Sequence, residues 1–129
     1  MLVGGRCSVY EDRPLACRTY DCRIYAAAGI AADRAAIAQQ VERWRFTHPS
    51  QDDRDRHTAV KAAARYIRQH SECLASDAAR RDPVRVAVLA IAVHEAFLQA
   101  GKRAAGRESS DHAIARAVVA ANEKLFGDW

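Results

Sequence analysis

Residues 82–101 read DPVRVAVLAIAVHEAFLQAG and set the architecture of the chain. Asp82 followed by Pro83 is a helix start signal, because aspartate caps a first turn and proline at the first helical position loses no hydrogen bond. Gly101 marks the expected end. Two apolar faces lie between these signals, formed by Val84, Val88, Ile91 and Leu98 and by Val86, Leu89, Val93 and Phe97. A helix that is apolar on most sides is usually buried by its neighbours. We therefore predict a helix from Pro83 to about Ala100 at the centre of the fold.

Three further helices are predicted around it, because apolar residues recur at helical spacing in three other segments. Their expected bounds are Ile24 or Asp33 to Phe46, Asp52 to Leu74, and Ser110 or Asp111 to Phe126. Four helices with short connections are typical of a small helical bundle. We therefore expect an all-α fold of one globular domain, in which residues 1–23 form an irregular segment packed on a helical region, residues 24–129.

The composition agrees with a helical fold and argues against a nucleic-acid partner. Half of the 129 residues are apolar, and many of these are alanine, the best helix former. The net charge is +4, with 17 arginines and three lysines interleaved with acidic residues along the chain. Because this interleaving forms no clustered basic stripe, we expect no nucleic-acid partner.

The hydropathy pattern predicts a cytoplasmic protein without a membrane partner. The longest apolar run, Val86 to Val93, is eight residues, well short of a membrane span. The N-terminus shows no basic region followed by an apolar one, as a signal peptide would. Cytoplasmic thiols stay reduced, so closely spaced cysteines there favour metal binding over disulfides.

Three of the four cysteines lie within sixteen residues, at Cys7, Cys17 and Cys22, spaced C-x9-C-x4-C. Three soft thiol ligands on a short irregular segment point to an iron–sulfur cluster or zinc. Arginines flank each cysteine closely in sequence, and positive charge favours the thiolate form that binds metal. They are Arg6, Arg13, Arg18 and Arg23.

Residues 5–22, GRCSVYEDRPLACRTYDC, resemble the second half of the cysteine-cluster domain of the YkgJ family. That family is described as chelating zinc or iron, and flagellin lysine-N-methylases carry a related domain. The matching positions are Cys7, Tyr10, Arg13, Pro14, Cys17, Arg18 and Cys22. The dense C-x2-C-x2/3-C-C block that opens the family pattern is absent, so the chain resembles an N-terminally shortened member.

The resemblance implies roles for the matched residues. Cys7, Cys17 and Cys22 would be the metal ligands. Arg13 and Arg18 would hold the loop or balance its charge. Pro14 would fix its turn, and Tyr10 would donate a hydrogen bond to a cluster sulfur or pack over the loop.

Closed zinc sites and cubane iron–sulfur clusters usually have four protein ligands, whereas the motif supplies three, so the fourth ligand stays open. Cys73 is a candidate fourth ligand, although a single cysteine in a helical pattern more often packs in a core. Pooling of cysteines in a homo-oligomer is the other route. The five histidines match no zinc motif, and we expect them on polar or boundary faces, except His94 on the central helix. Glu95, also on that helix, would need a partner such as an arginine if it is buried.

Three functions follow. The first is a metal-binding, iron–sulfur or zinc, cysteine-cluster protein whose physiological role is unknown. The second is a helical structural or interaction domain that has lost its metal site. The third is an enzyme resembling protein lysine methyltransferases, although no cofactor motif is visible in the sequence, so whether any reaction is catalysed stays open.

Overall fold

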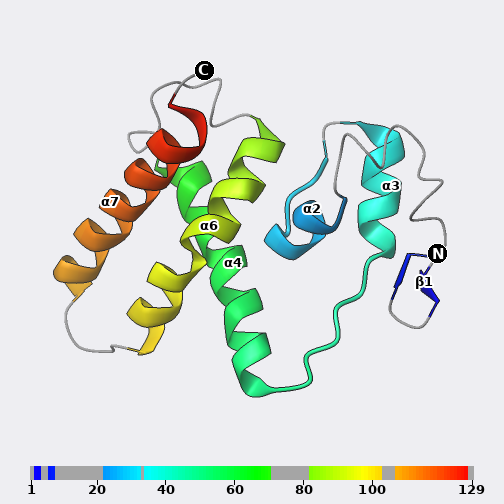
Figure 1. Ribbon diagram of the computed structural model, residues 1–129, viewed down its shortest axis with the longest axis horizontal. Coiled ribbons are helices and arrows are strands. Elements are labelled where there is room, and N and C mark those ends of the chain that lie inside the picture. Colours follow the sequence, from blue (N-terminus) through cyan, green and yellow to red (C-terminus); the bar gives the residue numbers. More distant parts are fainter. Residues whose placement is uncertain are drawn as a thin grey trace.

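The computed structural model describes residues 2–3, 6–7, 22–32, 34–70, 82–102 and 107–127, and these are dominated by helices (Figure 1). The helices are α2 (Cys22–Ala28), α3 (Ala35–Arg43), α4 (Gln51–Gln69), α6 (Pro83–Lys102) and α7 (Arg107–Phe126). Two short strands, β1 (Leu2–Val3) and β2 (Arg6–Cys7), pair antiparallel with Leu2 opposite Cys7. The predicted all-α class is confirmed.

The start of the chain departs from the expected irregular segment, since it contains this strand pair and the first two residues of α2. A helix from Ile24 to Phe46 is also wrong, because this stretch is divided into α2 and α3. The alternative start at Asp33 corresponds to α3, which begins at Ala35 and ends at Arg43, three residues before Phe46. Gly29 has φ 66°, a left-handed conformation that glycine adopts without a Cβ clash. The N–H of Gly29 donates to the carbonyl of Ala26 at 3.3 Å, and the N–H of Ile30 donates to that of Tyr25 at 2.9 Å. These two bonds form a Schellman motif, which ends α2.

Helix α4 begins at a reciprocal cap. The backbone N–H of Asp53 donates to Ser50 Oγ, and the backbone N–H of Ser50 donates to Asp53 Oδ2, both at 3.2 Å. This capping box satisfies amides that have no partner within the helix. The predicted start at Asp52 is correct to one residue. The helix ends at Gln69, with His70 as its C-cap, five residues before the predicted end at Leu74.

Helix α6 begins where the sequence predicts. Asp82 Oδ1 accepts from the backbone N–H of Val84 at 2.9 Å and of Arg85 at 3.3 Å, so Asp82 is the cap. The helix continues through Gly101 to Lys102, two residues beyond the predicted end. It packs against α2, α4 and α7, and Figure 1 shows it in the middle of the molecule. The prediction of a central helix is therefore confirmed.

Helix α6 is long and apolar enough to cross a membrane, by length and composition alone. This finding differs from the expectation of no membrane span, which rested on a longest uninterrupted apolar run of eight residues. The composition of α6 is weak evidence for a span, because the core helix of a globular fold has the same composition. Three helices cover α6 here, and the buried side chains on it are Val86, Ala87, Leu89, Ala90, Val93 and Leu98.

The core is built from small and medium side chains contributed by all five described helices. Its largest fully buried members are Tyr25, Ile67, Leu89, Val86 and Val118. Alanines fill the space between α4 and α6, which lets their backbones approach closely: Ala63, Ala64, Ala87 and Ala90. The core is therefore alanine-rich, as the composition indicates.

Helix α7 starts at Arg107, before the predicted caps at Ser110 and Asp111, and is joined to α6 by a polar contact. Asn122 is buried, and its Oδ1 accepts from Arg85 Nε at 3.1 Å and Nη2 at 2.8 Å. The same guanidinium lies 4.4 Å above the ring of Phe126. A buried amide oxygen with two donors is satisfied, so the contact fixes the position of α7 on α6.

The polar residues on α6 that the sequence singles out lie near the surface. Glu95 has 57% of its side chain exposed, so it is not buried and needs no arginine. Its neighbour is His94, whose Nε2 lies 3.9 Å from Glu95 Oε1. His94 Nδ1 lies 2.6 Å from the carbonyl oxygen of Ile91. Because His94 is partly exposed and bonded within its own helix turn, it forms no site with other described elements.

Candidate functional site

The cysteine motif lies largely outside the described residues. Cys7 lies in β2, and Cys22 is the first residue of α2. Cys17 lies outside the described part, as do the other motif positions and the candidate fourth ligand: Tyr10, Arg13, Pro14, Arg18 and Cys73. Among the residues that are described, no three His, Cys, Asp or Glu side chains are grouped as metal ligands would be. The ligand set therefore stays a prediction.

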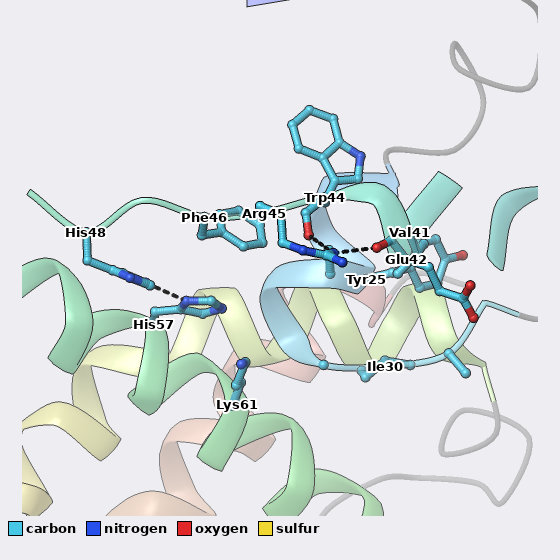
Figure 2. Close-up of a pocket in the computed structure, with 13 residues that line it drawn as sticks. Tyr25, Ile30, Val41, Glu42, Trp44, Arg45, Phe46, His48, His57 and Lys61 are labelled. Atoms are coloured by element: carbon cyan, nitrogen blue, oxygen red, sulfur yellow. Dashed lines mark hydrogen bonds between the residues drawn. The ribbon is translucent and has the colours of Figure 1, made fainter. Parts of the chain in front are cut away.

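The described residues do form a site that the sequence did not predict, an open hollow of about 440 Å³ where α2, α3 and α4 meet. The connection between α3 and α4 closes one side of it, and Figure 2 shows the side chains of this connection above α4. Its principal side chains are Tyr25 from α2, Val41 and Glu42 from α3, Trp44, Arg45, Phe46 and His48 from the connection, and His57 and Lys61 from α4.

A contact between two histidines joins the connection between α3 and α4 to α4. His48 Nε2 lies 2.8 Å from His57 Nδ1, and the two rings stack with centroids 5.0 Å apart. Phe46 packs its ring against His57 edge-on, at 4.8 Å between centroids. A hydrogen bond between two imidazoles requires one of the facing nitrogens to carry no proton, so it cannot survive when both rings are charged.

The surroundings of His57 favour its neutral form. Burial lowers the pKa of His57 below its ordinary value of 6.5, and the nearby charges of Lys61 and His48 lower it further. The backbone of Ala27 acts in the opposite direction, but His57 Nε2 is buried with no partner at hydrogen-bond distance. Burial and the neighbouring positive charges therefore favour the neutral form of His57, which is compatible with the bond to His48.

A second open hollow, of about 390 Å³, continues the first along α4. The two hollows share Gly29, Ile30 and Lys61. The remaining residues around the second are Ala28, Ala64, Arg65, Arg68 and Gln69. We call the two hollows together the α4 groove, which has the turn after α2 on one side and α4 on the other.

One side of the α4 groove is cationic. His57, Lys61, Arg65 and Arg68 are spaced i, i+4, i+8 and i+11 on α4, and therefore share one helix face. The last three are exposed and form no ion pair with another described residue. Glu42 is the one carboxylate among the described residues that line the groove. A clustered basic stripe therefore exists, contrary to the expectation from the sequence, because residues 57–71 contain no acidic residue.

This stripe could have been found from helical spacing. Residues 57–68 contain HxxxKxxxRxxR, which places four basic side chains on one face once α4 is predicted. The His48–His57 contact has no such signal, because it joins a helix to the connection before it. The apolar side of the groove likewise depends on where α2 packs.

No family model, curated protein or solved structure matches the chain.

Proposed function

We propose that the protein binds metal, as zinc or an iron–sulfur cluster, through Cys7, Cys17 and Cys22. The observation that carries the proposal is the C-x9-C-x4-C spacing in an arginine-rich segment. Thiolates are the ligands that both zinc and iron–sulfur clusters prefer, and nearby guanidinium groups stabilise thiolates and offset the negative charge of a cysteine–metal site.

The fold supports this proposal because it anchors one end of the motif. Cys22 is the first residue of α2, and Tyr25, three residues further on, is fully buried. Since α2 packs against α4 and α6, the backbone at Cys22 is fixed to the helical body. At the other end, Cys7 lies in β2, which pairs with β1. A chelating segment with one end fixed loses less conformational entropy when metal binds than a free one.

Metal content tests the proposal directly. Elemental analysis of the full chain, purified without oxygen or chelator, is expected to find stoichiometric zinc or iron. Cys17→Ser is expected to lose it, because the remaining motif thiolates cannot complete a site. Visible absorption distinguishes an iron–sulfur cluster from zinc, since zinc has no redox or d-electron transitions.

Two further variants sharpen the measurement. His57→Gln is the matched control and is expected to keep its metal, because His57 lies in the α4 groove and not in the motif. Cys73→Ser tests the fourth ligand, since loss of metal in this variant would assign Cys73 that role. A folded, helical wild-type chain with only trace metal would contradict the proposal.

A second proposal is a helical interaction domain that binds no metal. The observation that favours it is the α4 groove, which is formed by described residues other than the cysteines. Because the two functions depend on different residues, metal content and groove binding can each fail without the other.

A further inference from the structure

The α4 groove has the length of a short peptide. The side chains of α4 that line it extend from His57 to Arg68, eleven positions further along the helix, which is about 16 Å along the helix axis. An extended chain advances about 3.3 Å per residue, so about five residues would lie along this stripe. Both hollows are open to solvent along this length, and an elongated ligand would contact more of the groove than a compact one.

The charge of the groove selects an acidic ligand. Lys61, Arg65 and Arg68 project from successive turns of α4, and no described carboxylate pairs with them. Neighbouring cations on one helix face repel each other, and an anionic ligand would relieve this repulsion. The carboxylate of Glu42 lies at the other end of the groove, in the hollow beside α3.

The opposite side of the groove is apolar. Ala28 and Ile30 border the cationic hollow, with Ala64 beside them on α4. Phe46 lies at the far end, next to the histidine pair (Figure 2). Ala28, Ile30 and Ala64 are buried, so they offer a ligand little apolar surface, and negative charge is the main requirement. Nucleic acid fits this description less well, because the described residues around the cationic hollow include no aromatic ring on which a base could stack.

We propose that the α4 groove binds an extended acidic segment of a partner protein, in which carboxylate side chains pair with the exposed Lys61, Arg65 and Arg68. This interaction is independent of the metal proposed for the cysteine motif.

The test uses the full chain and a fluorescein-labelled peptide of alternating glutamate and leucine, followed by fluorescence anisotropy. Arg65→Glu and Arg68→Glu are each expected to weaken binding by about tenfold, because each replaces an attraction with a repulsion. Both residues are exposed, so the variants are expected to fold, which far-UV circular dichroism checks. Replacing the glutamates of the peptide with glutamine is also expected to weaken binding, and to do so more than replacing its leucines with serine, because the groove offers little exposed apolar surface.

Arg116→Glu is the matched control, because it makes the same change of net charge on α7, which lines neither hollow. Its affinity is expected to stay at the wild-type value. Equal weakening by Arg116→Glu would show a general charge effect and overturn the proposal. So would absence of peptide binding, or tighter binding of a single-stranded oligonucleotide that Arg65→Glu abolishes, which would assign the groove to nucleic acid.

Discussion

The protonation state of His57 affects whether the connection between α3 and α4 stays hydrogen-bonded to α4. His57 lies partly buried between Phe46 and His48, and it is the point where the connection between α3 and α4 bonds to α4. The groups that face it are Lys61 on its own helix, His48 on the connection, and the backbone of Ala27 on α2. Protonation of both histidines would remove the hydrogen bond and place two positive charges side by side.

The lowered pKa of His57 gives stability a definite pH dependence. The unfolded chain titrates this ring near 6.5, and the folded chain titrates it at a lower pH because burial and Lys61 oppose the charge. Between these two values the unfolded state binds more protons, so stability rises with pH. The contribution of His57 to the free energy of unfolding is therefore fully present above pH 6.5 and is lost as the pH falls below this value.

Urea unfolding on both sides of pH 6.5 measures this effect. His57→Gln is expected to show a weaker dependence of the unfolding midpoint on pH than wild type. His112→Gln, at an exposed position on α7, serves as the control and is expected to follow wild type. A pH dependence that is the same in His57→Gln and wild type would contradict the assignment.

The helix boundaries show which local signals are sufficient to predict an element. The starts of α4 and α6 were predictable because Ser50 and Asp82 cap them through side-chain bonds within a few residues. The end of α2 was not predicted, because residues 24–46 are rich in alanine and contain no proline. Gly29 was the signal for this end, but glycine alone does not decide where a helix stops: α2 ends before Gly29, whereas α6 continues through Gly101.

Substitution by alanine should therefore change the stability of the fold in opposite directions at Gly29 and at Gly101. Gly29→Ala is expected to destabilise the fold by about 1–2 kcal/mol, since φ of 66° places a Cβ in a strained conformation. Space is not the reason, because a Cβ there would lie 3.7 Å from Lys61 Cγ, an ordinary contact. Gly101→Ala is expected to stabilise it by up to about 0.5 kcal/mol, because Gly101 is helical with open space around its Cα.

Urea denaturation of the two variants measures both values. The comparison is internally controlled, since the same substitution is made at the end of α2 and near the end of α6. Equal effects of the two substitutions would show that the left-handed turn does not determine the cost at Gly29.

Across the molecule, the sequence could predict the helical class, the central position of α6 and the start of α4, because these depend on local caps and apolar periodicity. It could not predict the α4 groove. The cationic stripe follows from spacing on α4, but its apolar side comes from the turn at Ala28–Ile30, and that turn reaches α4 only through packing around Tyr25. Tertiary contacts of this kind carry no periodic signal in the sequence.

The core also determines what removal of the proposed metal should do. Its buried residues come from all five described helices, and its largest members are Tyr25, Ile67, Leu89, Val86 and Val118. A chain of this length can bury enough apolar surface to fold without a metal, unlike a small zinc finger. We therefore expect the metal-free chain to keep its helices and to unfold cooperatively.

Far-UV circular dichroism and thermal unfolding check this expectation, with wild type compared before and after chelation and with Cys17→Ser. The helical signal is expected to be nearly unchanged, and the midpoint is expected to fall, because metal binding to the folded chain adds stability. The fall should be confined to protein that held metal, so chelator should leave Cys17→Ser unaffected. Loss of the helical signal on chelation would mean that the metal site, and not the alanine-rich core, holds the helices together.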